Sequence, residues 1–327
     1  MRYLGVDGGG TKTVFVLIDA AGRILARASR GSSCYVEVGF DRFAAVLAEG
    51  IAEVCAAAGI GPDGITFSFL GIPAYGEIAK DTPRIEAVVG SIFPHDRFRC
   101  GNDVEVGWAG SLTCRPGIHL VAGTGAIGYG RDPEGNTARA GGWGSFLGDE
   151  GSAYWLGKQL ISHFTKQSDG REDKTALYEI VRNTYHIARD FDFTSVLYDE
   201  MQMKRDEIAK LALLVYEAAR RNDARAIALY DAAAYEHSLT VKALLRQLRF
   251  PAGREVPVSY SGGVFGAGGL ILEPLKRHLA GEPVRLKRPA LLPVTGAALY
   301  AMILSGRPAS GALIAELRRQ EKAVGMR

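Results

Sequence analysis

The chain has 327 residues, of which 47% are hydrophobic and 23% are charged, with a formal net charge of +3. This composition is typical of a globular protein of about two domains, and the interspersed charges argue against a nucleic-acid or anionic-membrane surface. No segment approaches the roughly 18 uncharged apolar residues of a membrane helix. Four widely spaced cysteines and the absence of a signal-peptide pattern predict a reduced, cytoplasmic protein.

The first predicted elements are three strands, at residues 2–6, 13–19 and 24–29. The turn between the first two has the sequence DGGGT, which contains more glycine than a two-residue hairpin needs. Apolar residues at helical spacing predict a helix over residues 40–58. A strand in ITFSFLGIP, a helix over residues 82–93 and a strand in FRCGND follow, and this last strand is expected to end in an acid.

The opening pattern returns about 115 residues later, where IHLVAGTGAIGYGRDPEGNTARAGG predicts a strand, a glycine-rich turn, a strand, a turn and a strand. Further helices are predicted over residues 151–165, 173–188, 204–222, 224–247 and 308–322. A strand in EVPVSYS runs into a third glycine cluster. This long internal repeat predicts two related domains, 1–115 and 116–307, and we expect the helix at about 308–327 to pack back on the first.

Glycine clusters at the ends of three predicted strands indicate sites where backbone N–H groups can approach a phosphate. A single cluster could equally be a tight turn, but three at strand ends favour a ligand. DGGGTKT is not a Walker loop, because Thr11 stands where the final glycine would be. GTGAIG matches the dinucleotide-binding pattern, but a strand rather than a helix follows it. The sequence therefore favours phosphate-binding hairpins between strands.

These motifs resemble those of a known superfamily. DGGGTKT, GTGAIGYG and SGGVFGAGG, in this order, resemble the first phosphate, second phosphate and adenosine motifs of the actin/hexokinase-type ATPases. GGWGSFLGDEGSAYWLG (141–157) resembles the signature of the BadF/BadG/BcrA/BcrD ATPase family, and in particular its N-acetylglucosamine kinase branch. The resemblance implies an α/β fold of two ribonuclease H-like domains, each with a mixed five-stranded sheet flanked by helices, with a cleft between them and more helix in the second.

The same resemblance implies a kinase that uses ATP and Mg²⁺ to phosphorylate an amino sugar, at its 6-hydroxyl, and that forms a homodimer. The ATP contacts that it implies are Gly8, Gly9, Gly10, Thr11, Gly123, Thr124, Gly125, Ala209, Gly262, Gly263, Val264, Phe265 and Gly266. The substrate contacts that it implies are Cys34, Asp103, Ala126, Ile127, Gly142, Trp143, Gly144 and Asp149.

Three acids carry the chemistry that the resemblance implies, and each has a structural alternative. Asp7 would hold Mg²⁺, usually through water, or else cap a turn. Asp103 would be the general base that accepts the proton of the sugar hydroxyl, or would cap a helix that starts near Val104, and both can be true. Asp149 would bind the sugar, or with Glu150 would only begin a helix with favourable charge.

Two departures from the family pattern leave the sugar open. Cys34 and Ile127 stand where the characterised kinases carry asparagine, so N-acetylglucosamine, glucosamine and N-acetylmuramic acid are all retained as candidates. Trp143 could be plain core, which is the commoner place for a tryptophan. The alternative function is an ATPase that activates an acyl-CoA dehydratase or reductase through an iron–sulfur cluster. It needs closely placed cysteine ligands, and the spacing of Cys100 and Cys114 does not favour it.

Overall fold

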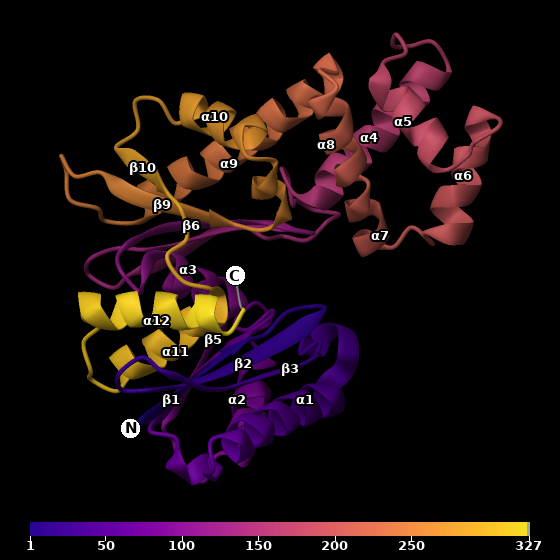
Figure 1. Ribbon diagram of the computed structural model, residues 1–327. Coiled ribbons are helices and arrows are strands. Elements are labelled where there is room, and N and C mark those ends of the chain that lie inside the picture. The colour runs from indigo at the N-terminus through magenta and orange to yellow at the C-terminus, as the bar shows by residue number, and fades with distance from the viewer. Residues whose placement is uncertain (326–327) are drawn as a thin grey trace. The chain divides into compact units, whose positions relative to one another are not determined.

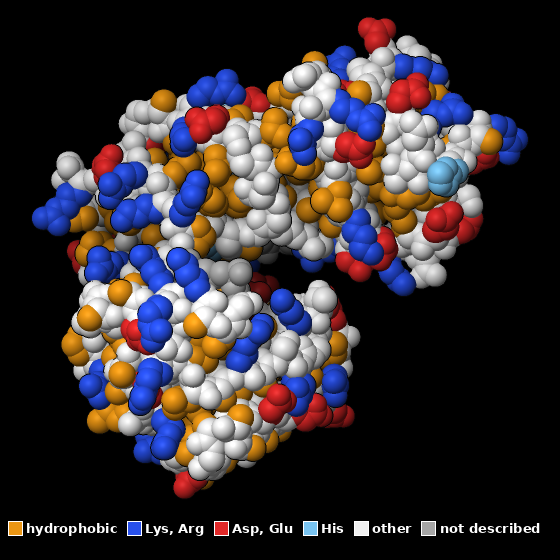
Figure 2. All heavy atoms as spheres, viewed as in Figure 1, with side chains coloured by type: hydrophobic (Ala, Val, Ile, Leu, Met, Phe, Trp, Pro, Cys, Tyr) orange, Lys and Arg blue, Asp and Glu red, His pale blue; other side chains and the backbone are white. Residues whose placement is uncertain are grey.

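The computed structural model describes residues 1–325 (Figure 1). Contacts divide the chain into two compact units. The first combines Met1–His119 with the chain from Arg288 onward, and the second is Leu120–Lys287. Among the described helices, none has the length and hydropathy of a membrane span. Acidic and basic side chains both occur on each unit on the face that Figure 2 displays.

The first unit is built on a mixed sheet with the strand order β3-β2-β1-β4-β5. Its strands are β1 (Arg2–Asp7), β2 (Lys12–Asp19), β3 (Ile24–Gly31), β4 (Phe67–Ile72) and β5 (Phe98–Asn102). The first three strands pair antiparallel, whereas β1 with β4 and β4 with β5 pair parallel. The carboxyl ends of β1, β4 and β5 therefore share one edge of the sheet, and the glycine turn after β1 lies at that edge.

Helices cover both faces of this sheet (Figure 1). They are α1 (Tyr35–Ala57), α2 (Thr82–Ile92), α3 (Asp103–Leu112), α11 (Pro293–Leu304) and α12 (Gly311–Ala323). Leu4 and Val6 belong to the buried cluster that α1 and α2 close over. Gly5 points to the opposite face, where any Cβ would overlap the backbone of α11 at Ala298, so glycine is required for this close approach.

The second unit repeats the sheet. Its strands are β6 (Gly117–Ala122), β7 (Ala126–Arg131), β8 (Thr137–Gly141), β9 (Val256–Ser261) and β10 (Val284–Lys287). Their order, β8-β7-β6-β9-β10, matches the first sheet strand for strand. As in the first sheet, the second and third strands (β7 and β8) pair antiparallel, and the last two (β9 and β10) pair parallel. Two mixed five-stranded sheets flanked by helices are the fold expected from the sequence, and this expectation is confirmed.

The chain between β8 and β10 makes the second unit rich in helix. The helices are α4 (Ala153–Ser168), α5 (Ala176–Thr184), α6 (Phe193–Ser195), α7 (Arg205–Lys210), α8 (Ala212–Arg220), α9 (Ala224–Gln247) and α10 (Gly269–His278). The long α9 packs on β7 and β8, and α10 packs on α9. Figure 1 shows α5 and α6 away from the sheet, with α4, α7 and α8 between them and the strands.

Several elements differ from the sequence expectations. The helix expected over residues 40–58 extends back to Tyr35, interrupted at Gly39, whose φ is 78°. The helix expected over 204–222 divides into α7 and α8 at Leu211. The sequence pattern predicts no helix at α10 or α11. The internal repeat predicts a second domain over residues 116–307, whereas α11 packs on β1, β4 and α3 of the first unit.

Candidate functional site

The glycine turn between β1 and β2 is held by close backbone contacts. The N–H of Gly8 donates to the carbonyl of Gly71 at 2.9 Å, and the N–H of Ser33 donates to the carbonyl of Gly9 at 3.3 Å. A Cβ on Gly8 would lie 2.6 Å from both the Gly71 oxygen and the Ser33 hydroxyl oxygen. Gly10 and Thr11, by contrast, are exposed at the tip of the turn. The turn is therefore fixed at its base and accessible at its tip.

Two carboxyl groups lie beside this turn. Asp7 is the last residue of β1, and Asp103 is the first residue of α3, directly after β5. Burial, followed by the negative charge of Asp103, raises the pKa of Asp7 to about 7, and Lys12 opposes this only in part. Because the ends of β1 and β5 share one sheet edge, the fold itself brings the two acids close enough to interact.

Asp103 does not cap α3. The N-cap is Asn102, whose side-chain oxygen accepts a hydrogen bond from the N–H of Val104 at 3.2 Å. By its position in the sequence, Asp103 could cap α3, act as the general base, or do both. The structure assigns the cap to its neighbour, so the capping explanation for Asp103 is wrong. Asp103 also stands at the beginning of α3 rather than at the end of a strand, one residue later than β5 extends.

Cys34 joins the same edge of the first unit. It precedes α1, follows the segment that bonds to Gly9, and is half-buried. Burial, with smaller contributions from the charges of Glu37 and Asp103, raises the pKa of its thiol. The first unit thus brings together Asp7, the glycine turn, Cys34 and Asp103, all of which the sequence analysis selected.

The glycine turn between β6 and β7 is held by the start of a helix. The N–H of Gly123 donates to the carbonyl of Gly125 at 2.9 Å, and the N–H groups of Ala153 and Tyr154 donate to the carbonyls of Gly123 and Thr124 at 2.9 and 3.3 Å. The first turn of α4 therefore docks on this hairpin. A Cβ on Gly123 would meet nothing within 4 Å, so the packing of the described residues does not require glycine there. The space beside Gly123 is accessible to a ligand.

The third glycine cluster abuts the second hairpin. Gly262 has φ = 100°, and a Cβ on it would lie 2.8 Å from the Gly123 nitrogen and overlap the Ala122 carbonyl. The chain then forms the short 3₁₀ turn η4 (Gly263–Ala267). The side chain of Phe265 is buried against His237 and Tyr260, with ring centroids 5.2 and 5.1 Å away.

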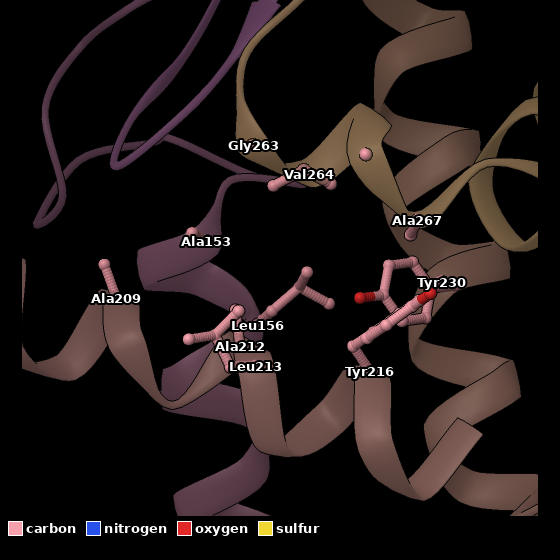
Figure 3. A pocket seen from close by; sticks show the side chains of 11 residues that line it. Ala153, Leu156, Ala209, Ala212, Leu213, Tyr216, Tyr230, Gly263, Val264 and Ala267 are labelled. Atoms are coloured by element: carbon pink, nitrogen blue, oxygen red, sulfur yellow. The ribbon is translucent and has the colours of Figure 1, made fainter. Parts of the chain in front are cut away.

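An apolar cavity of about 280 Å³ opens beside η4 (Figure 3). Its lining residues are Ala153, Leu156, Ala209, Ala212, Leu213, Tyr216, Tyr230, Gly263, Val264, Gly266 and Ala267. Figure 3 shows Ala209 at one end and the two tyrosines at the other. Four of these residues were selected from the sequence as ATP contacts, and the structure brings them to one cavity. Its apolar walls and open form suit a flat, largely apolar group such as a purine base.

Asp149 lies beside the second hairpin and is 3% exposed. Its φ is 61°, an uncommon backbone conformation for a residue other than glycine. One carboxylate oxygen accepts a hydrogen bond from the N–H of Ala126 at 3.2 Å, and the other lies 2.7 Å from a guanidinium nitrogen of Arg205. The cap of α4 is Ser152, so Asp149 does not begin that helix and its helix-starting explanation is wrong.

The loop between β8 and Asp149 presents apolar side chains to solvent. Trp143 is 73% exposed and Phe146 is 95% exposed, so the interpretation of Trp143 as a core residue is wrong. A Cβ on Gly142 would lie 2.6 Å from the Ile127 side chain, which places the start of the loop against β7. Glu150 is exposed. The second unit thus brings Ala126, Ile127, Gly142 and Asp149 to the neighbourhood of its hairpin.

Arg205 also lies in this neighbourhood, and no motif in the sequence marks it. It lies 56 positions after its partner Asp149 and begins a short helix of ordinary mixed charge. Neither the spacing nor a local motif marks it, because the contact depends on how α7 packs against α4 and the hairpin. Only the polar side chain of Asp149, next to a glycine loop, could have prompted a search for a cationic partner.

The repeated sheet, with a glycine hairpin at the same place in each copy, is an actin/hexokinase-like fold. The crystal structure of the ROK hexokinase from Thermus thermophilus has this fold, with a TM-score of 0.61 at 17% identity, covering 94% of this chain and 99% of that one. The chain belongs to the BadF/BadG/BcrA/BcrD ATPase family, whose profile matches residues 4–301. The family expected from the sequence is confirmed, and membership implies ATP as a ligand.

Similar proteins include two curated kinases. The chain is 30% identical over 289 residues to the N-acetyl-D-glucosamine kinase of Dictyostelium discoideum, covering 85% of this chain and 89% of that one. It is 30% identical over 280 residues to the N-acetylmuramic acid/N-acetylglucosamine kinase of Clostridium acetobutylicum, covering 85% and 90%. A solved structure from Chromobacterium violaceum, provisionally assigned as an N-acetylglucosamine kinase, has a TM-score of 0.73 at 26% identity, covering 92% and 98%.

Proposed function

We propose that the protein phosphorylates an amino sugar, of the N-acetylglucosamine or glucosamine type, on its 6-hydroxyl with ATP. The observation that carries the proposal is the pair of acids Asp7 and Asp103 at one sheet edge, beside a glycine hairpin, in a chain whose relatives are amino sugar kinases. Phosphoryl transfer needs chiefly an aligned nucleophile and neutralisation of the phosphate charge, and these residue types supply both.

In this proposal Asp103 is the general base. It accepts the proton of the sugar's 6-hydroxyl while the hydroxyl oxygen forms a bond to the γ-phosphorus. The bond between that phosphorus and the bridging oxygen breaks, and ADP leaves with the electron pair. Support comes from the position of Asp103 on the first turn of α3, where it is half-buried and does not serve as the helix cap.

Asp7 would hold Mg²⁺ together with the nucleotide phosphates. No three His, Cys, Asp or Glu residues among residues 1–325 are grouped closely enough to hold a metal ion by themselves. A single carboxylate such as that of Asp7 fits Mg²⁺, because proteins usually hold this ion by one or two carboxylates, and phosphate oxygens and water complete its coordination. When bound, the cation neutralises charge on the phosphate oxygens. Asp7, with its pKa of about 7, would exchange a proton for the cation.

The second unit would bind the nucleotide. The base would enter the apolar cavity that Ala209, Val264 and Gly266 help to line, and the phosphates would lie along Gly123–Gly125. The open space beside Gly123 supports this placement, because no side chain stands between a ligand and the backbone there. Asp149 would contact the sugar, and Trp143 would offer an exposed apolar face to a pyranose ring.

The test is a panel of acceptors. Purified protein with ATP and Mg²⁺ is assayed for ADP release with N-acetylglucosamine, glucosamine, N-acetylmuramic acid, glucose and no sugar, and the product is identified by ³¹P NMR. We expect ADP release that depends on an amino sugar and yields a 6-phosphate ester. ATP hydrolysis that is independent of sugar would instead favour the activator alternative, and equal rates with glucose would contradict the amino sugar preference.

A further inference from the structure

Arg205 lies directly over the second glycine hairpin. A guanidinium nitrogen of Arg205 is 2.7 Å from the nearer carboxylate oxygen of Asp149. Another residue at position 125 would place its Cβ against this guanidinium, so Gly125 leaves the room that the arginine occupies. Asp149 is buried, whereas the Arg205 side chain is 44% exposed. The guanidinium therefore turns one edge to a buried acid and keeps other donors accessible to solvent.

Asp149 fixes the direction of this guanidinium. Its other carboxylate oxygen accepts the N–H of Ala126, the first residue of β7, at 3.2 Å. The carboxylate thus links the hairpin backbone to Arg205, and its own backbone is set in the left-handed region. An arginine held by a fixed acid loses little freedom when it binds an anion, so its remaining donors are preorganised.

The second hairpin has no positive charge of its own. In the first hairpin the glycines lead through Thr11 directly into Lys12, whereas the residues around the second, VAGTGAIGYG, include no basic side chain. A nucleotide triphosphate carries several negative charges, and neutral backbone N–H groups offset them only in part. A guanidinium brought from elsewhere in the second unit would add strong hydrogen-bond donors for phosphate oxygens. Arg205 is placed to do so, although Asp149 offsets part of its charge.

Helix α7 carries both Arg205 and a residue that lines the apolar cavity. Ala209, one turn after Arg205 on the same helix, lines the cavity beside η4. Gly262, which precedes η4, packs against Gly123 at the start of the hairpin. The cavity, the hairpin and the guanidinium are therefore neighbours within the second unit. A base in the cavity would direct its phosphates toward the hairpin and Arg205.

We propose that Arg205 binds the phosphate groups of the nucleotide at the second hairpin and that Asp149 holds it in position for this contact. The proposal rests on the proposed function in one respect, namely that the cavity and the hairpin form the nucleotide site. It adds to that function a cationic phosphate ligand in the second unit, and it gives Asp149 a task toward the nucleotide besides its task toward the sugar.

The test compares ligands that differ only in their number of phosphates. Affinities of adenosine, AMP, ADP and a non-hydrolysable ATP analogue are measured by calorimetry for the wild type and for Arg205→Gln, without sugar and at one ionic strength. We expect unchanged adenosine affinity and a loss that grows with phosphate number, reaching about tenfold or more for ADP and the ATP analogue, as charge-assisted hydrogen bonds are lost. Arg205→Lys should recover part of the loss, because it keeps the charge without the fork.

Lys210→Gln is the matched control. Lys210 is a cation on the same helix, but its ammonium pairs with Glu207 at 2.6 Å on the exposed side, so its removal should change none of the four affinities. If Arg205→Gln lowers all four affinities by one factor, or lowers none, the arginine does not bind phosphate and the proposal is overturned. Adenosine binding also reports whether the variant keeps the cavity folded.

The outcomes separate this proposal from the proposed function. A wild type that binds ADP but phosphorylates no sugar would overturn the kinase function, and the phosphate-dependent loss in Arg205→Gln would still support the arginine contact. A wild type that phosphorylates an amino sugar, with a uniform loss in the variant, would overturn only the arginine contact. A wild type that binds no adenine nucleotide at all would overturn both.

Discussion

The two glycine hairpins occupy the same place in two sheets of the same order, but different interactions hold them. The first hairpin is bonded through its backbone to β4 and to the segment before α1, with the N–H of Gly8 donating to Gly71 and the N–H of Ser33 donating to Gly9. The second is bonded through its backbone to the start of α4, and the side chains of Asp149 and Arg205 add an ion pair beside it. A repeated fold thus fixes where a hairpin lies, and the side chains brought to it decide what it can do.

The contrast extends to the acid beside each hairpin. Asp7 in the first unit has its pKa raised to about 7, because burial and Asp103 outweigh the nearby Lys12. Asp149 in the second unit is paired with a guanidinium and a backbone N–H. We interpret the first acid as poised for a cation that is not part of the chain, and the second as satisfied by the chain itself.

The largest expected effect is on turnover, through the first unit. Asp103→Asn removes the general base while keeping the size of the side chain, so we expect kcat with the amino sugar to fall by about 10²–10⁴-fold. Nucleotide affinity should stay nearly unchanged, because the second unit would bind the base and most of the phosphates. Coupled assay of ADP release measures the first quantity, and calorimetry with ADP measures the second.

Asp96→Asn is the control for this change, because Asp96 is an exposed acid in the same unit, just before β5. It should leave both kcat and ADP affinity unchanged. Near-normal turnover of Asp103→Asn would remove Asp103 as the base. If Asp103→Asn also lost ADP affinity, the expectation that the second unit binds most of the nucleotide would be contradicted.

The next effect is on stability, and its sign should differ between the two acids. The carboxyl of Asp7 titrates near pH 7 when folded, but at its ordinary value near 3.8 when unfolded. Between these values the folded protein holds a proton that the unfolded chain has lost, so the free energy of unfolding falls as the pH rises through this window. Asp7→Asn should therefore raise the free energy of unfolding by about 2 kcal/mol at pH 8, without metal or nucleotide, and much less at pH 4.

Asp149→Asn should act in the opposite direction. It removes the negative charge that Arg205 faces and turns one of the two accepting oxygens into an NH2 donor, so we expect the free energy of unfolding at pH 8 to fall by about 1–2 kcal/mol. Urea unfolding of the two variants and the wild type at pH 4 and pH 8 measures both effects. If both variants change the free energy of unfolding at pH 8 in the same direction, the charges of the two acids do not differ in how well the folded chain neutralises them.

The sequence predicts those features of the two units that depend on local patterns of residues. Alternating apolar residues and glycine turns identify both sheets, and the helix expected over residues 224–247 has the bounds of α9. Helix α11 escapes the pattern because it is apolar on all sides, as buried helices are, and so lacks the one-sided stripe that marks an amphipathic helix. Its position depends on Gly5 and Gly296, which let backbones approach closely.

The candidate site divides in the same way. Its glycines and acids fall in short motifs, so the sequence selects Asp7, Asp103 and Asp149 directly. The contact between Asp149 and Arg205 joins residues far apart in the chain, and no local pattern encodes it. The same holds for the identity of the cap of α3, since Asn102 and Asp103 are adjacent and either could cap a helix by residue type. Tertiary packing decides both.

The smallest expected effects come from adding one methyl group to a glycine of each hairpin. In Gly8→Ala the new Cβ would lie 2.6 Å from the Gly71 oxygen and 2.9 Å from the Pro73 ring, so the backbone has to move. We expect a loss of about 1–2 kcal/mol in the free energy of unfolding. In Gly123→Ala the Cβ meets no atom within 4 Å, so stability should stay within about 0.5 kcal/mol of the wild type.

The order should reverse for nucleotide affinity, because the methyl group of Gly123→Ala would occupy the space predicted for a phosphate. A single lost hydrogen bond to phosphate corresponds to a roughly tenfold weaker ADP affinity. Urea unfolding and ADP calorimetry on the two variants separate the effects. If Gly123→Ala binds ADP as the wild type does, the open space beside the second hairpin is not a phosphate site. If it is instead destabilised like Gly8→Ala, the second hairpin is a packed turn like the base of the first.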